Sequence, residues 1–247
     1  VAPNGRMGAQ VCRLVAEDPA FSLHGCVVPP GEDGGVLLAS VDAANADVMV
    51  DFSHRSAAAD HASWCADHNV ALVLGTTGLT DEDQAAVDAA AQSTIVFQAS
   101  NFSVGVALLA DLAARAARVL GVAADVEIVE SHHHHKVDAP SGTAITLGKS
   151  VAAARGQVYE DVAVDGRSGL VGARKAGEIG MHALRLADIV GRHSVHFGWA
   201  SEGLVLSHEA RDRAVFARGA LRAAAFAHKT RATGAVGVVG MPEMLSD

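Results

Sequence analysis

The first hundred residues alternate short apolar runs with stretches of helical spacing. Four apolar runs have the length of strands: residues 22–28, which form the weakest, 47–52, 70–74 and 94–97. Thr80 followed by Asp83 has the form of a capping box, which predicts a helix that ends near Gln92. Because strands and helices alternate here, we predict a parallel, doubly wound sheet.

The pattern changes after residue 102. A long alanine-rich helix is expected over 103–120, and Gly121 ends it. Apolar and polar residues then alternate in three segments, 125–131, 179–186 and 203–208. Such alternation is typical of half-buried strands, so we predict an open, antiparallel or mixed sheet with one face on a helix.

Together these patterns predict an α/β protein with two domains. A Rossmann-type parallel sheet domain is expected over 1–102 and 213–247, because an amphipathic helix at 212–226 can return to it. An α+β substrate domain with an open mixed sheet is expected over 103–212. The length of 247 residues allows such a division.

Composition limits the possible partners and the cellular compartment of the protein. The net charge of −9 argues against a nucleic-acid partner, since phosphate contacts need clustered Lys and Arg. The three cysteines are widely spaced and include no CxxC pair, which is typical of a reduced intracellular chain. No apolar run approaches the ~20 residues of a membrane span, so we expect a soluble, cytoplasmic protein without a membrane partner.

The chain opens on a glycine-rich turn, VAPNGRMG, just before a helix. Gly5 and Gly8 would let the backbone approach a pyrophosphate at the helix N-terminus, and Arg6 adds positive charge. The turn alone is equally compatible with an ordinary helix start. The strand that normally precedes such a turn is missing from the sequence, so we expect the native product to be longer at its N-terminus.

Two features of the usual dinucleotide-binding pattern are absent. Ala2 stands where the first glycine is expected, and no acid or arginine follows ~20 residues later, where Val28 precedes two prolines. Glu32 or Asp33 could substitute from the loop. A preference for NADH or NADPH therefore cannot be read from the sequence.

Two further loops follow predicted strands. GTTG at 75–78 follows the strand at 70–74, and ASNF at 99–102 follows the strand at 94–97. Ligands of open α/β sheets lie beyond the carboxyl ends of strands, so both loops are placed to line a nicotinamide ribose. Each loop taken alone is also compatible with ordinary turn chemistry.

The segment 130–144, ESHHHHKVDAPSGTA, carries the richest chemistry. Ser141 to Thr143 would begin a helix, whose free amides and hydroxyls suit a carboxylate. Lys136 and one or more histidines add charge and proton-transfer capacity. A solvated polar loop, a tag remnant or a metal site are the alternatives. Strand alternation brings at most two of the histidines together, and no Asp or Cys has ligand spacing, so we predict no metal.

The segment 127–144 closely resembles the signature of the 4-hydroxy-tetrahydrodipicolinate reductase family. GRMG, DFS at Asp51, GTTG, ASNFSVGV and LRLADIVGRHSVHFG at Leu184 also resemble family segments, in family order, over nearly the whole chain. The resemblance implies NADH- or NADPH-dependent reduction of a cyclic dicarboxylic imine to tetrahydrodipicolinate in lysine and diaminopimelate biosynthesis. It also implies a homotetramer joined through substrate-domain sheets.

The resemblance also assigns roles to residues. It makes His132 and Lys136 catalytic, with Lys136 as the proton donor, whereas His134 falls at a variable position and His135 receives no role. Implied substrate contacts are His133, Ser141, Gly142 and Thr143. Implied cofactor contacts are Asn4, Gly5, Arg6, Met7, Gly75, Thr76, Thr77, Ala99, Ser100, Asn101 and Phe102. The alternatives are a non-catalytic dinucleotide sensor, a related two-domain dehydrogenase and a histidine-rich metal binder.

Overall fold

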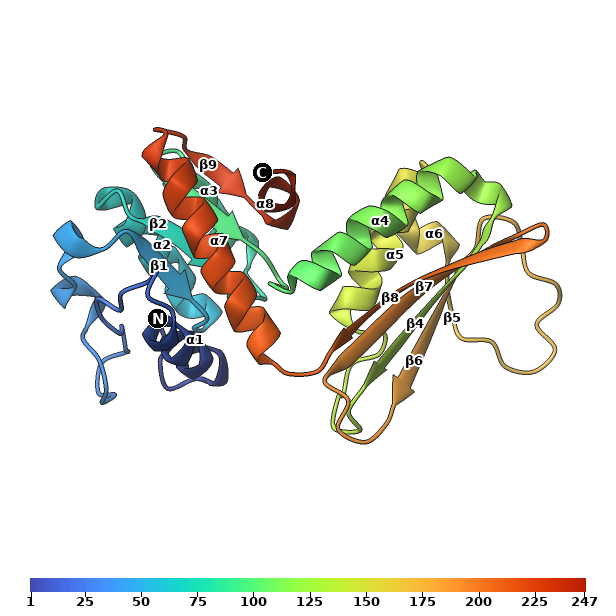
Figure 1. The fold of residues 1–247 in the computed structure, drawn as a ribbon, viewed down its shortest axis with the longest axis horizontal. Helices are drawn as coiled ribbons and strands as arrows, with labels where there is room; N and C mark the ends of the chain where they lie inside the picture. Colours follow the sequence, from blue (N-terminus) through green and yellow to red (C-terminus); the bar gives the residue numbers. More distant parts are fainter. The chain divides into compact units, whose positions relative to one another are not determined.

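The computed structural model describes residues 1–247, which divide into two compact units (Figure 1). The first unit joins Val1–Val104 to Ala214–Asp247, and the second comprises Gly105–Arg213. The boundaries predicted from the sequence pattern lie close to these.

The first unit is built on a parallel sheet with the strand order β1-β2-β3-β9. Its strands are β1 (Val48–Asp51), β2 (Ala71–Leu74), β3 (Ile95–Gln98) and β9 (Gly237–Val239). Every residue of β2 is buried, because helices cover both faces of the sheet. This explains why β2 appears in the sequence as an unbroken apolar run.

Helices of the first unit pack on both faces of this sheet. One face packs against α2 (Arg55–Asp67) and α3 (Asp81–Ala90), and the other against α1 (Arg6–Glu17) and α7 (Ala214–Ala232). The capping box that predicted α3 is present, with Thr80 N and Asp83 N each bonded to the other residue's side chain. The remaining short elements are η1 (Leu38–Ser40), η2 (Ala43–Asn45) and α8 (Met241–Ser246).

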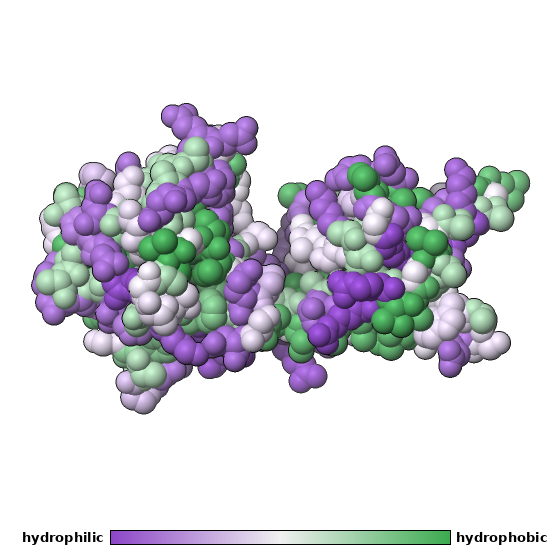
Figure 2. All heavy atoms as spheres, turned by 90° about the horizontal axis from the view of Figure 1, so that it is seen from above, coloured by the Kyte–Doolittle hydropathy of each residue, from purple (hydrophilic) through white to green (hydrophobic).

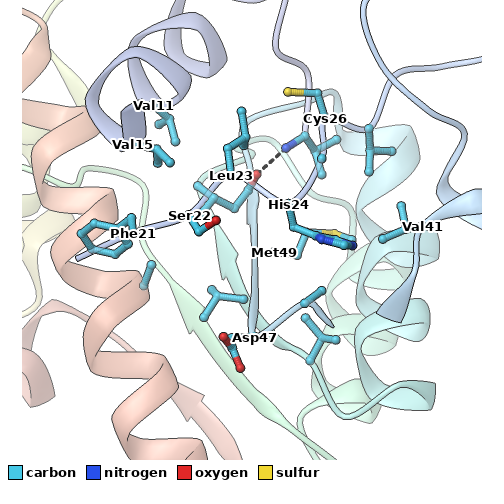
Figure 3. A pocket seen from close by; sticks show the side chains of 18 of the residues that line it. Val11, Val15, Phe21, Ser22, Leu23, His24, Cys26, Val41, Asp47 and Met49 are labelled. Atoms are coloured by element: carbon cyan, nitrogen blue, oxygen red, sulfur yellow. Dashed lines mark hydrogen bonds between the residues drawn. The ribbon is translucent and has the colours of Figure 1, made fainter. Parts of the chain in front are cut away.

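The weakest predicted strand, residues 22–28, does not join the sheet. It forms a single parallel bridge between Val27 and Val36. A cavity of about 830 Å³ lies between this segment and the edge strand β1 (Figure 3). Because this cavity separates the segment from β1, the two do not pair as neighbouring strands. Val11 and Val15 of α1 also line the cavity, which contains none of the predicted catalytic residues.

The second unit is built on a mixed sheet with the strand order β5-β6-β4-β7-β8. Its strands are β4 (Asp125–His132), β5 (Ala163–Asp165), β6 (Ile179–Arg185), β7 (Gly191–Trp199) and β8 (Glu202–Ala210). The β5–β6 and β6–β4 pairs are parallel, and the β4–β7 and β7–β8 pairs are antiparallel. The predicted α/β class, with a parallel sheet and a mixed sheet, is confirmed.

Helices cover one face of the second sheet. They are α4 (Val104–Leu120), η3 (Gly121–Ala123), α5 (Gly142–Ala154) and α6 (Tyr159–Val162). Alternate residues of β4 and β7 enter the core beneath α4 and α5, while the residues between them face away. Aliphatic side chains also reach the surface, among them Leu112 and Val119 of α4, and hydrophobic atoms appear on both units in Figure 2. No helix of the chain has the length and apolarity to cross a membrane.

Candidate active site

The glycine-rich turn leads directly into α1. Gly5 is the N-cap, and no side chain caps the first amides of the helix. A Cβ on Gly8 would lie 2.0 Å from the Ala2 carbonyl oxygen, so the turn closes tightly only with glycine there. Uncapped amides and the adjacent Arg6 give this turn the features of a diphosphate site. The residues present therefore fit a dinucleotide.

The loop after residue 28 contacts this turn. Asn4 Nδ2 donates to Glu32 Oε2 at 3.3 Å and to the Asp33 carbonyl oxygen at 3.1 Å. The sequence lacks an acid at the end of the 22–28 segment, where the adenosine ribose is usually bound. The structure places Glu32 beside the turn instead.

The two loops after β2 and β3 lie together, as expected from their place in a parallel sheet. A cavity of about 250 Å³ is lined by both loops, together with Gln84 and Gln98. Of the predicted cofactor contacts, those that line it are Thr76, Thr77, Ala99 and Ser100. A Cβ on Gly75 would lie 2.2 Å from the Phe52 ring, so glycine allows this close approach.

The side chain of Phe102 is turned into the core instead of toward this cavity. It is 2% exposed and packs against Phe52 and Phe97, with ring centroids 5.3 and 5.9 Å away. Asn101 Oδ1 accepts from Ser103 N at 2.8 Å, which stabilises the turn into α4. Neither Asn101 nor Phe102 lines the cavity.

A buried carboxylate supports the loop after β2. Asp51 is bonded to His61 Nδ1 at 2.8 Å and accepts from Ser53 N and Thr76 Oγ1. Burial would raise the pKa of Asp51, but the bonds and charge of His61 and the bonds from Ser53 lower it overall. The DFS motif thus fixes Thr76, a role that sequence reasoning had not assigned to it.

The second unit contains the other predicted set of residues, at the end of β4 and the start of α5. Glu130 is buried, and its Oε2 lies 2.5 Å from His132 Nδ1. Its Oε1 accepts from the backbone N of Ser141 at 3.1 Å. Arg185, at the end of β6, binds both oxygens of this carboxylate at 2.9 and 3.0 Å.

The helix start predicted at Ser141 to Thr143 is present. Ser141 is the N-cap of α5, and its Oγ accepts from Ala144 N at 3.2 Å. The same Oγ lies 3.1 Å from Nε2 of the buried His193. Burial, with the charge of His132 next, lowers the pKa of His193 to about 4, so this imidazole is neutral near pH 7.

Lys136 and the other histidines occupy the loop between β4 and α5. Lys136 Nζ is 2.8 Å from Asp138 Oδ1, and the lysine side chain is 21% exposed. Desolvation, followed by the positive charges of Arg213 and His132, lowers the pKa of His133. His134 and His135 are exposed and their ring centroids lie 4.0 Å apart.

Sequence reasoning missed three partners in this site. Arg185 and His193 lie in the LRLADIVGRHSVHFG segment, which had been noted only for its resemblance. Glu130 begins the segment 130–144 and had been given no role. Its position two residues before His132 on a strand was a usable signal, because such residues share a face.

The fold and these residues define the class of protein. The first unit has a doubly wound sheet with a glycine turn and two loops at the carboxyl ends of strands. The second has a helix N-terminus that suits the carboxylate of a ligand. The same loop region carries Lys136 and His132, and the His132 ring is bonded to the side chain of Glu130. Together they define an NAD(P)H-dependent oxidoreductase that acts on an anionic substrate.

Comparison with known proteins identifies the family. The family descriptions "Dihydrodipicolinate reductase, N-terminus" and "Dihydrodipicolinate reductase, C-terminus" match residues 1–102 and 105–245. The chain is 46% identical over 237 residues to a 4-hydroxy-tetrahydrodipicolinate reductase of Anaeromyxobacter sp. (strain Fw109-5), covering 90% of this chain and 88% of the relative. The corresponding reductase of Ruegeria pomeroyi is 43% identical over 238 residues, with the same coverage.

Solved structures agree with this match. A dipicolinate-bound dihydrodipicolinate reductase from Paenisporosarcina sp. TG-14 is similar with a TM-score of 0.75 and 26% identity, over 97% of this chain and 95% of that one. A C. glutamicum DAP dehydrogenase shares the fold at a TM-score of 0.57 and 12% identity, over 98% of this chain and 92% of that one. The chain belongs to the 4-hydroxy-tetrahydrodipicolinate reductase family, whose enzymes use NADH or NADPH in lysine biosynthesis.

Proposed function

We propose that this chain reduces 4-hydroxy-tetrahydrodipicolinate to tetrahydrodipicolinate, with its first unit binding NADH or NADPH and its second unit binding the substrate. The observation that carries the proposal is the helix start at Ser141, which follows Lys136 by five residues and is linked through Glu130 to His132. A dicarboxylate needs fixed donors for at least one carboxylate, and the N-terminus of α5 supplies them.

Each residue of the second-unit site has a separate role in the proposed reduction. NADH or NADPH, when bound, would supply the hydride that adds to the conjugated C=C of the dehydrated substrate. Lys136 donates a proton from Nζ to the resulting enamine, which completes the reduction. His132 acts beside it, orienting water or stabilising charge as hydroxide leaves. Gly142 and Thr143 hold the carboxylate, and His133 contacts the substrate. Ser141, which was also predicted to contact the substrate, is buried and caps α5, and its N–H is already bonded to Glu130.

A direct assay tests the proposed reaction. Oxidation of NADH and of NADPH is followed by absorbance in the presence of freshly generated 4-hydroxy-tetrahydrodipicolinate, with a substrate-free control. Substrate-dependent oxidation is the expected result. Binding of a dinucleotide without oxidation would contradict the proposal and favour the sensor alternative.

We propose that Glu32 makes the cofactor site favour NADH. Its carboxylate lies beside the diphosphate turn through Asn4, so it can accept from a ribose hydroxyl but would repel a 2′-phosphate. Glu32→Gln should tighten NADPH binding by about three- to tenfold, the scale of one exposed charge pair, with a smaller effect on NADH.

Dissociation constants for NADH and NADPH, measured by calorimetry, test this prediction. Asp33→Asn is the matched control, because Asp33 contacts Asn4 through its backbone carbonyl and not its carboxylate. An equal change for both dinucleotides in Glu32→Gln would contradict the assignment.

We also propose that the protein is a cytoplasmic homotetramer joined through the uncovered face of the second sheet. Val205 of β8 is 56% exposed there, and the neighbouring Arg192–Glu209 pair lies on the same face. Sedimentation should show a tetramer, and Val205→Glu should reduce the assembly state, since a buried charge is costly at an interface. A monomeric wild-type chain at micromolar concentration would contradict this proposal.

A further inference from the structure

Glu130 occupies an unusual position in the second unit. It is the only buried acid there, with 1% of its surface exposed. Its two oxygens contact three separate segments: His132 on β4, the Ser141 amide at the start of α5, and Arg185 at the end of β6. These segments carry the proton-transfer and carboxylate-binding groups of the proposed reaction.

The charge of Glu130 persists despite its burial. Burial would raise the pKa of this carboxyl, but hydrogen bonds and charge from Arg185 and His132 hold it below its usual range. Glu130 is therefore ionised near neutral pH and can only accept hydrogen bonds. Its contact with His132 Nδ1 then requires the proton on that nitrogen, in both the neutral and the cationic ring.

The consequence concerns the other ring nitrogen of His132. With Nδ1 protonated, Nε2 is the ring nitrogen that is left to accept a proton. His193 packs edge-on against this ring, with centroids 5.1 Å apart, and adds no charge because it is neutral. The charged group in contact with His132 is thus Glu130, to which Arg185 also binds.

We propose that Glu130 is a positioning residue: it holds His132 in the Nδ1–H tautomer, and the same carboxylate binds both Arg185 and the first amide of the α5 start. This inference rests on the proposed function of the site. Arg185 bound to both carboxylate oxygens fixes the plane of the carboxylate, and that plane orients the imidazole. The Ser141 bond connects the same carboxylate to the proposed substrate-binding amides.

Nitrogen NMR of the intact wild-type protein is the first test, because it does not depend on activity. The His132 resonances, assigned by their loss in His132→Gln, should show a protonated Nδ1 at neutral pH. An unprotonated Nδ1 would overturn the proposal. An inactive protein with a protonated Nδ1 would contradict the proposed function but not this inference, so the two failures are distinguishable.

Glu130→Gln is the second test. We expect kcat to fall by about 10- to 100-fold, by analogy with the loss of a carboxylate that orients a metal-binding histidine. Dinucleotide affinity should not change, because the cofactor residues lie in the other unit. In a His132→Gln background the same change should leave kcat unaltered while raising KM, because the bond from the Ser141 amide loses its charged acceptor in both backgrounds.

Glu127→Gln is the matched control. Glu127 lies on the same strand but faces the other side of the sheet, where it also pairs with a histidine and with arginines. Its replacement should leave kcat and the His132 tautomer unchanged. Independent, additive losses of kcat in Glu130→Gln and His132→Gln would overturn the proposal. If Glu130→Gln does not fold, the tautomer of His132 in the wild-type protein still tests the proposal.

Discussion

Replacement of Lys136 by alanine is expected to lower kcat by about 10²- to 10⁴-fold, the usual contribution of a positioned general acid. The lysine is the proposed donor of the proton that completes the reduction. Its Nζ is held by Asp138 at 2.8 Å and remains partly accessible. Dinucleotide affinity should stay near the wild-type value, because Lys136 belongs to the second unit. Steady-state kinetics and dinucleotide titration measure the two quantities.

Two controls separate proton donation from simple charge. Lys136→Arg keeps a positive charge near the substrate but provides a guanidinium that does not give up its proton, so KM should recover more than kcat. Asp138→Asn removes the ion pair and keeps the lysine, so its effect should be much smaller. An unchanged kcat in Lys136→Ala would refute the assignment of this lysine.

Phe102→Ala is expected to lower the free energy of unfolding by about 3–5 kcal/mol, as for other buried aromatic side chains. Phe102 was predicted to contact the cofactor, but its ring lies in the core of the first unit between Phe52 and Phe97. Its backbone is also tightly packed, since a Cβ on Gly219 of α7 would lie 1.7 Å from the Phe102 carbonyl oxygen. The substitution should therefore lower the free energy of unfolding, and its effect on dinucleotide affinity should be small.

Urea denaturation of the wild-type and variant proteins measures this loss. Ser100→Ala is the matched control in the same loop. Its exposed side chain lines the cavity after β3, so it should alter dinucleotide affinity and change stability by less than about 0.5 kcal/mol. Reduced dinucleotide affinity with wild-type stability in Phe102→Ala would mean that this ring contacts the cofactor directly.

The local pattern of the sequence was sufficient for most of the elements. The strands β1, β2 and β3 appear as apolar runs because helices bury both faces of their sheet. Strands β4, β6 and β8 of the second sheet were predicted from alternation, which arises because only one face is covered. Strand β7 was not predicted, although its residues also alternate between buried and more exposed positions. The three-residue strands β5 and β9 were missed, since so few residues define no period.

The sequence by itself determined the two kinds of sheet, the helix starts at Thr80 and Ser141, and the motif that holds Lys136 and His132. These depend on neighbouring residues, whose spacing sets periodicity and capping. Only the tertiary structure decided that Arg185, 55 positions from Glu130, completes the carboxylate cluster, and that Phe102 enters the core. Strand order and side-chain packing arise from contacts between residues distant in the chain, and no local pattern records them.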